Sequence, residues 1–159
     1  MKSQSCRTAQ FGFDCTLAVV KPHALADNQA GAIIEALGEQ GLQLTALRMV
    51  HLDASSAEKF LGSYREVLDA YSLTVRQFAS GPCIAMELVH PSGRAQEVLF
   101  DACGPFDVAI AKKIRPDSLR ARFGENKVLN AIHCTDLPAP DGQLESRFFF
   151  DVLGPPGKK

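Results

Sequence analysis

Four short apolar runs, separated by segments with helical patterns, constrain the fold of this 159-residue chain more than any other feature. The runs are residues 15–20 (CTLAVV), 42–50 (LQLTALRMV), 83–89 (CIAMELV) and 130–133 (NAIH). Each has the length of a strand, and most are dominated by β-branched and other apolar residues. The chain is therefore predicted to form one four-stranded sheet.

Helices are predicted between these strands. The order βαβ, further helices and a second βαβ indicates an α/β (α+β) protein with the ferredoxin-like βαββαβ fold, an antiparallel four-stranded sheet and helices on one face. Asp27 or Asn28 is expected to cap the first helix, and Leu144, Phe148 and Phe149 to pack inward from the last. The expected helices cover residues 29–40, 55–64, 72–79, 95–102 and 143–152, with shorter pieces at 108–113 and 118–123.

The length of the chain suits a single domain, which we expect to cover residues 14–152. Residues 1–13 are predicted to be a flexible lead-in and residues 153–159 a disordered tail. The net charge of −1 does not support a nucleic-acid partner, because binding a phosphate backbone needs a basic surface. No apolar run is long enough to cross a bilayer, so we do not expect a membrane protein.

The five cysteines are scattered along the chain at positions 6, 15, 83, 103 and 134. None forms a Cys-x-x-Cys motif and none is grouped with histidine at zinc spacing, so no protein metal site is predicted. Reduced thiols in a cytoplasmic location fit this pattern best. Cys134 is expected to be a small apolar filler.

His133 stands where a chemically active side chain is expected, between an apolar strand and the residues Cys-Thr-Asp at 134–136. A neutral imidazole is a good nucleophile toward phosphorus. Arg115 and Arg120 precede it, and the arginine fork gives a phosphate two parallel hydrogen bonds. Taken alone, a histidine after a strand is more often structural, so these residues leave both interpretations open.

The segments IRPDSLR (114–120) and NAIHCTD (130–136) together resemble the active-site segment of nucleoside diphosphate kinases. The usual form in that family is P-G-T-[IL]-R followed by N-x-[IV]-H-[GC]-[ST]-D. The resemblance runs from about residue 15 to residue 152. Within the family, the sequence H-C-T-D-L-P is most similar to the C-terminal kinase-like domain of the subgroup called nucleoside diphosphate kinase seven.

The resemblance implies a reaction and a set of site residues. His133 would take the γ-phosphoryl group of a nucleoside triphosphate as phosphohistidine and pass it to a nucleoside diphosphate, with Mg²⁺ bridging the phosphates. Glu145 would hydrogen-bond the other ring nitrogen, Lys21 and Arg120 would contact phosphates, and Asn130 would bond the ribose hydroxyl. Without the resemblance, Glu145 is a solvated helix residue and Lys21 a surface lysine at the end of a strand.

Two departures from the family pattern concern the side of the site that holds the nucleoside. Leu61 stands where the family has a tyrosine, and Tyr64 follows one turn later. The aromatic residue on which the base stacks falls near Ala70, where only the neighbouring Tyr71 is available as a substitute. Tyr71 is therefore the expected base platform.

The phosphate side departs as well. Phe100 occupies the position of the second phosphate-binding arginine. Arg94 and Arg115 are nearby but not at the matching position, and Arg115 is the one expected to bind nucleotide. The threonine that contacts the β-phosphate falls near Phe106. Half of the phosphate clamp is therefore predicted to be altered, which favours reduced activity.

Two functions follow from the resemblance. The first is a nucleoside diphosphate kinase. The second is a catalytically weakened kinase-like module with a structural role on ciliary or axonemal microtubules, with tubulin as its partner and the axoneme or centrosome as its location. Family members typically form hexamers, so a homo-oligomer is a further expectation. A chain ending soon after its last helix also suits a monomer or dimer.

Overall fold

The computed structural model describes residues 14–137 and 141–153, which include one four-stranded antiparallel sheet. The strands are β1 (Cys15–Val20), β2 (Gln43–His51), β3 (Pro82–Val89) and β4 (Ile132–Cys134), arranged in the order β2-β3-β1-β4. This order confirms the predicted ferredoxin-like sheet. The lead-in at 1–13 and residues 154–159 of the predicted tail lie outside the described residues.

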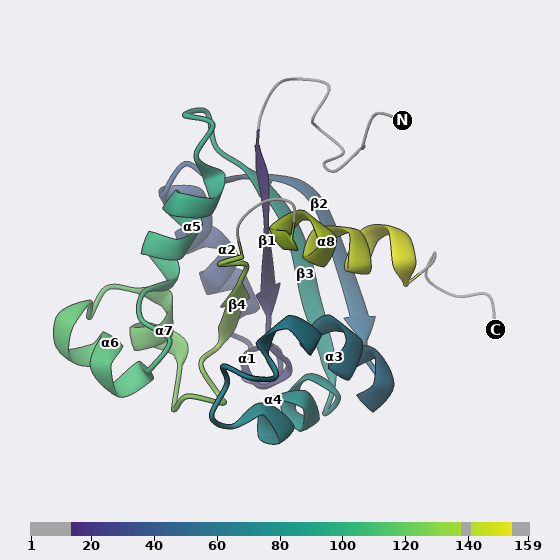
Figure 1. The fold of residues 1–159 in the computed structure, drawn as a ribbon. Coiled ribbons are helices and arrows are strands. Elements are labelled where there is room, and N and C mark those ends of the chain that lie inside the picture. Colours follow the sequence, from purple (N-terminus) through teal and green to yellow (C-terminus); the bar gives the residue numbers. More distant parts are fainter. Residues whose placement is uncertain (1–13, 138–140, 154–159) are drawn as a thin grey trace.

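The helices surround the sheet in the positions labelled in Figure 1. They are α1 (Pro22–Ala26), α2 (Ala30–Glu39), α3 (Ala54–Phe60), α4 (Tyr71–Phe78), α5 (Ala95–Cys103), α6 (Val108–Ile114), α7 (Leu119–Phe123) and α8 (Asp141–Arg147). A 3₁₀ turn, η2 (Gly62–Tyr64), follows α3, and a π-helical turn, η3 (Phe148–Val152), follows α8. No described helix is both long enough and apolar enough to span a bilayer.

Helices cover both faces of the sheet, which differs from the expectation of one covered face. Ala18 and Val20 of β1 belong to a core built with α1, α2, α5 and α7, whereas Leu17 and Val19 belong to a second core built with α3, α4 and η3. Alternate side chains of a strand point to opposite faces, so an apolar run such as β1 demands cover on both sides. In Figure 1, α8 lies in front of the sheet and α2 behind it.

The chain after β1 turns directly into α1, a helix that the sequence reasoning missed. Lys21 keeps the extended backbone that precedes a proline, and Pro22 takes the first helical position, where its missing N–H costs no hydrogen bond. The predicted cap of the next helix is wrong. Gln29 is the residue before α2, and Asn28 adopts the left-handed conformation with φ 58°.

The C-terminal helix is wound differently from the expected regular helix. Leu144 is exposed rather than turned inward, whereas Phe149 is fully buried. The wider turn of η3 shifts the helical register, and Arg48 of β2 donates a 2.8 Å hydrogen bond from Nη1 to the Phe149 carbonyl. Strand β2 therefore holds η3, the turn that continues directly from α8.

A tight turn leads into β4. Ala131 has φ 68°, and the Ile132 amide donates to the Asn130 carbonyl at 2.8 Å, which makes a three-residue γ-turn. The Ala131 carbonyl in turn accepts from the Lys21 amide at 2.9 Å. A positive φ at a residue other than glycine costs about 1–3 kcal/mol, and residues with such strain cluster at functional sites. The turn thus ties the start of β4 to the end of β1.

Candidate functional site

His133 lies at the centre of β4, opposite Val19 of β1, and its ring is enclosed by aromatic side chains. The ring centroids of Phe60 and Tyr64 lie 5.0 and 5.5 Å from that of His133, in edge contacts at 72° and 90°. Phe78 adds a third contact at 6.3 Å. Only 11 % of the His133 side chain is exposed, so its ring plane is fixed by packing.

Glu145 of α8 holds one nitrogen of the His133 ring. The distance from His133 Nε2 to Glu145 Oε2 is 3.3 Å. Burial raises the pKa of Glu145, but His133 and the Thr135 and Tyr64 hydroxyls outweigh that effect and lower it below the usual range. Because an ionised carboxylate only accepts hydrogen bonds, Nε2 donates to it, and in the neutral form of the ring the lone pair is then on Nδ1. The pair therefore leaves Nδ1 as the nucleophilic atom.

Tyr64 is a site residue for which sequence reasoning found no role. Its hydroxyl donates a 2.9 Å hydrogen bond to Asp136 Oδ1, three residues after His133. Burial, together with the Glu145 and Asp136 carboxylates, raises the pKa of Tyr64, so the phenol stays protonated. The only signal in the sequence was that Tyr64 lies one turn after Leu61, the position at which the family has a tyrosine.

Lys21 is buried at the end of β1, although the residues alone indicated a surface lysine. Its Nζ donates to the Val128 carbonyl at 3.0 Å and lies 5.3 Å from the centroid of the Phe78 ring. Burial and the nearby Arg120 charge lower the pKa of Lys21 to about 7. The lysine is therefore poised to gain a proton when an anion arrives.

Arg120 is also buried, and all three of its guanidinium nitrogens contact the protein. Nη1 donates to the Gly104 carbonyl at 2.9 Å, Nε to the Ile132 carbonyl at 3.3 Å and Nη2 to Cys134 Sγ at 3.5 Å. Within the described part of the chain, neither Arg120 nor Lys21 forms an ion pair. Buried cations without a counter-ion favour the binding of an anion.

These residues line a single cleft of about 500 Å³. Lys21, Arg120, Asn130 and His133 all contribute to its wall, so the fold brings Lys21, near the start of the chain, together with three residues of the segment 120–133. Asn130 is fully buried; its amide donates to the Phe106 carbonyl at 3.3 Å, while its Oδ1 has no hydrogen-bond partner among the described residues. An orphaned acceptor of this kind suits a hydroxyl donor on a ligand.

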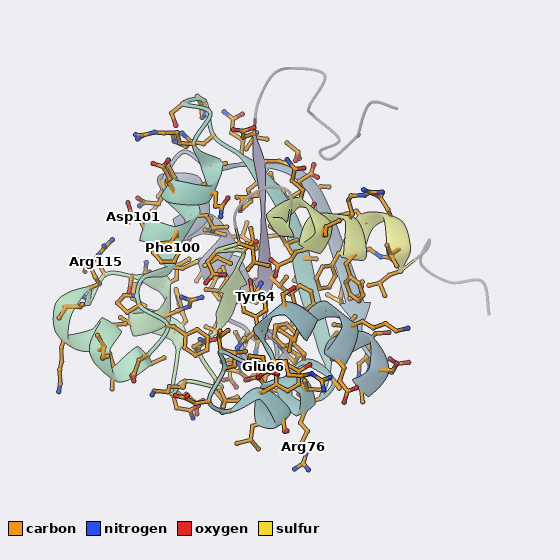
Figure 2. The ribbon with its side chains drawn as sticks, in the orientation of Figure 1. Tyr64, Glu66, Arg76, Phe100, Asp101 and Arg115 are labelled. Atoms are coloured by element: carbon orange, nitrogen blue, oxygen red, sulfur yellow. The ribbon has the colours of Figure 1, made fainter. Side chains whose placement is uncertain are left out.

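Two predicted nucleotide-binding residues are not brought to this cleft. Arg115 turns outward and binds Asp101, through a 2.9 Å hydrogen bond to its carbonyl and a 3.9 Å contact with its carboxylate. Figure 2 shows Arg115 and Asp101 on the outer side of the molecule, away from Tyr64. Tyr71 does not line the cleft either; its hydroxyl donates to the Glu58 carbonyl at 3.3 Å.

Two phenylalanines that the resemblance placed at phosphate-binding positions, and three charged residues that sequence reasoning did not place in the site, complete the cleft. Phe100 and Phe106 both line it, and the Phe106 ring lies 5.5 Å from the Arg120 guanidinium carbon. Lys127 lies 3.4 Å from an Asp107 carboxylate oxygen and 4.0 Å from one of Asp69. These three charged residues also line the cleft, so its walls are linked by ion pairs as well as by packing.

The chemistry open to this arrangement follows from its charges. The His133 ring, with Nε2 bonded to Glu145 and Nδ1 left free, faces the same cleft as two buried cations that lack counter-ions among the described residues. An anion with an electrophilic phosphorus atom satisfies both requirements at once, because its oxygens neutralise the cations while its phosphorus meets the nucleophile. Fold and site together thus define a protein of the class that handles phosphoryl groups.

Comparison with known proteins narrows this class to a family. The family model described as nucleoside diphosphate kinase matches residues 14–153. Nucleoside diphosphate kinase homolog 7 of Rattus norvegicus is 39% identical over 146 residues, which is 92% of this chain and 36% of that protein. A nucleoside diphosphate kinase of Aquifex aeolicus is 34% identical over 87% of this chain and 94% of its own. The chain belongs to the nucleoside diphosphate kinase family.

The solved structures agree with this assignment. A crystal structure of the Aquifex aeolicus nucleoside diphosphate kinase superposes with a TM-score of 0.79 at 33% identity, covering 88% of this chain and 96% of that one. The chain spans about a third of the length of the homolog 7 proteins that it matches. It is similar to those proteins over one domain-sized part.

Proposed function

We propose that this chain is a nucleoside diphosphate kinase that works through phosphorylated His133. The observation that carries the proposal is the pairing of His133 Nε2 with Glu145, in a cleft that also contains Lys21 and Arg120, two cations that form no ion pair with any residue the structure describes. A structural histidine needs no such cations, whereas a phosphoryl acceptor does. The resemblance stated from the sequence and the family membership of the chain support the same reaction.

The proposed transfer is an in-line displacement. The Nδ1 lone pair of His133 forms a bond to the γ-phosphorus, and the bond from that phosphorus to the bridging oxygen breaks, so that the nucleoside diphosphate leaves with the electron pair. Glu145 holds the proton on Nε2 and stabilises the positive charge that develops on the ring. Lys21 and Arg120 stabilise the charge on the phosphate oxygens, and a second nucleoside diphosphate reverses the step.

The donor set of the cleft fits Mg²⁺ bound chiefly through the nucleotide. Among the described residues, no three histidine, cysteine or carboxylate side chains converge on one metal position. Mg²⁺ is commonly held by one or two carboxylates together with substrate phosphates. Asp136 is the carboxylate of the cleft wall that lies beside His133, and it is the residue we expect to assist. When bound, the ion would neutralise charge on the β- and γ-phosphates.

Turnover is expected to be slower than it would be with the family's full set of polar contacts to the phosphates. Phe100 and Phe106 give the cleft apolar surface at the two positions where the family resemblance leads us to expect an arginine and a threonine. Losing one charged phosphate contact costs about 1.5–3 kcal/mol, roughly tenfold to a hundredfold in binding or rate. The proposal is therefore a kinase of reduced activity.

Labelling of the histidine tests the proposal. Purified protein is incubated with Mg²⁺ and ATP labelled at the γ-phosphate, and acid-labile label is then measured. We expect label in the wild type and in the control His51→Ala, whose histidine lies outside the cleft, and none in His133→Ala. Label that persists in His133→Ala, or no label at millimolar nucleotide, would count against phosphohistidine chemistry.

The second candidate is a weakened kinase-like module that binds microtubules of the cilium. The apolar Phe100 and Phe106 favour it, because a site kept only for structure no longer needs a full phosphate clamp. Co-sedimentation with polymerised tubulin that is unchanged by His133→Ala would support this role. A chain that stays in the supernatant would leave the kinase as the remaining function.

A further inference from the structure

Glu87 of β3 is a buried acidic residue that does not line the cleft and has no part in the proposed transfer. It is only 2 % exposed, and it forms no ion pair with any residue that the structure describes. Burial of such a group costs stability unless its oxygens are hydrogen-bonded. Here Thr45 Oγ1 lies 3.0 Å from Oε1, and Ser146 Oγ donates to Oε2 at 3.2 Å. Glu87 thus links β2 to α8.

The backbone of β2 is shaped to deliver the first of these hydroxyls. The pairing with β3 shifts between Leu44 and Ala46, which leaves Thr45 as the extra residue of a β-bulge. A bulge of this kind re-aims a side chain. The Thr45 hydroxyl comes within 3.1 Å of the Glu87 carbonyl oxygen as well as 3.0 Å of its carboxylate. The contact is therefore fixed by the strand pairing.

The second hydroxyl belongs to α8, the helix that carries Glu145. Among residues 142–147 of this helix, the two buried side chains, Glu145 and Ser146, are both polar. Leu144 is 55 % exposed, so these residues place no large apolar side chain in the core. The position of α8 on the sheet therefore depends on the hydrogen bonds of Glu145 and Ser146 and on η3, which follows it.

These two hydrogen bonds hold α8 on both sides of β1. Strand β1 lies between β3 and β4 in the sheet, and Figure 1 shows α8 in front of β1 and β3. Ser146 reaches Glu87 on β3. Glu145, the preceding residue, reaches His133 on β4. A shift of α8 that breaks the contact with Glu87 therefore also moves Glu145 relative to His133.

The contact between Glu145 and His133 is sensitive to such a shift. Its length of 3.3 Å is already at the long end of the range for a hydrogen bond. Oε1, the other carboxylate oxygen of Glu145, has no hydrogen-bond partner among the described residues. No second bond retains this carboxylate when the helix moves, and a misplacement of about 1 Å can slow a reaction about a hundredfold.

We propose that Glu87 is a positioning residue, which sets α8 through Ser146 so that Glu145 meets Nε2 of His133. The consequence for catalysis rests on the phosphohistidine chemistry proposed above, whereas the effect on the His133 ring does not. The role requires hydrogen bonding at position 87 and not a charge. A glutamine there can accept from Ser146 through its oxygen while its amide group donates to the Thr45 hydroxyl, which keeps the backbone carbonyl as its own acceptor.

The first measurement is the tautomer of His133, read by NMR from the ring nitrogens of protein labelled with ¹⁵N-histidine, at a pH where the ring is neutral. It needs no nucleotide, and His133→Ala assigns the signals. We expect the proton on Nε2 in the wild type. Ser146→Ala and Glu87→Met should raise the share of the tautomer with the proton on Nδ1, because Nε2 loses its acceptor.

Two further variants are expected to keep the tautomer of the wild type. Glu87→Gln is the conservative replacement that preserves the hydrogen bond to Ser146. Thr45→Ala is the matched control, because it removes a hydroxyl from the same carboxylate without touching α8. Ser146→Ala deletes a single hydroxyl, so it keeps the test decisive if Glu87→Met does not fold.

The second measurement is the rate of phosphohistidine formation at saturating ATP, with the affinity for ADP measured in parallel. Ser146→Ala and Glu87→Met should slow the rate about tenfold, because Glu145 no longer supports the ring. Neither side chain lines the cleft, so the affinity for ADP should stay at the wild-type value.

The outcomes separate positioning from a merely structural role. Thr45→Ala that shifts the tautomer as much as Ser146→Ala does, in step with a loss of stability in urea, would overturn the proposal. An unchanged tautomer in Ser146→Ala would also overturn it, as would Glu87→Gln that behaves like Glu87→Met. The predicted shifts of the tautomer in a protein that never takes up label would support the positioning role and count against the kinase alone.

Discussion

Lys21→Met is expected to make this protein more stable while it impairs nucleotide binding. The lysine is buried, and its pKa falls from the ordinary value of 10.5 to about 7, chiefly through burial. At about 1.4 kcal/mol for each pKa unit, this fall corresponds to about 5 kcal/mol of penalty on the charged form. Because the group is close to half neutral at pH 7, the cost to the folded state there is about 4 kcal/mol.

Methionine has a similar length and carries no charge. The substitution removes the burial cost but also the hydrogen bond from Nζ to the Val128 carbonyl and the contact with the Phe78 ring. Those two interactions are worth about 1–2 kcal/mol together. We therefore expect the free energy of unfolding to rise by about 2–3 kcal/mol at pH 7.

The pH dependence gives the prediction a second, independent check. Between pH 7 and 10.5 the unfolded chain binds a proton at Lys21 that the folded chain does not, so the stability of the wild type should rise with pH across this window. The gain from Lys21→Met should therefore be largest at pH 7 or below and shrink toward pH 10.

Urea unfolding followed by circular dichroism at several pH values measures both effects. Lys59→Met is the control, because this lysine is exposed on α3 and its replacement should change stability by less than about 0.5 kcal/mol. A loss of stability in Lys21→Met, or a gain that does not change with pH, would refute the claim that burial of the charge dominates.

Three further predictions concern the same cleft. Glu145→Gln should slow phosphohistidine formation about tenfold to a hundredfold in single-turnover labelling, because the amide stabilises the charged His133 ring less well than the carboxylate. The lowered pKa of Glu145 contributes stability that is present above its ordinary value of 4.5 and lost as pH falls through the folded value. The difference in unfolding free energy between wild type and Glu145→Gln should therefore vanish in acid, and a constant difference would contradict this reasoning. Tyr64→Phe removes the hydrogen bond to Asp136 and should lower the free energy of unfolding by about 1 kcal/mol in urea titrations, whereas an unchanged value would mean that this bond contributes nothing. ADP binding at pH 8 should take up close to one proton, because phosphate raises the pKa of Lys21 from about 7. Calorimetric titration in buffers of different ionisation enthalpy measures that uptake, and none would show that the lysine does not meet the phosphate.

Much of the fold was predictable from the sequence because the strands carry strong local signals. The predicted strand at residues 15–20 coincides with β1, and the other three strands were located to within a few residues. The short helix α1 was missed because a proline after a lysine marks both the end of a strand and the first turn of a helix. The covered second face was missed although both sides of β1 are apolar, because burial on two faces depends on which elements return to pack there.

The site was harder to predict, since burial is a property of the folded chain. No local pattern distinguishes Lys21 as a buried cation from a surface lysine, and only the packing of Phe78 and Val128 around it reveals the difference. Arg115 is only five residues before Arg120, which lines the cleft, yet its pairing with Asp101 turns it outward. The left-handed backbone of Ala131 has no sequence signature, because glycine is the residue expected at such a φ.

Alternate side chains of β4 point to opposite faces of the sheet, so the residues that support phosphate binding and those that hold the nucleophile lie in different cores. Ile132 and Cys134 pack into the layer that supports Arg120, whereas His133 points into the aromatic layer on the opposite side of the sheet. Damage to one layer should therefore disturb ligand capture and damage to the other should disturb the nucleophile. Enlarging mutations in either half would then yield two separable kinds of defective protein, one that fails to hold nucleotide and one that holds it without reacting.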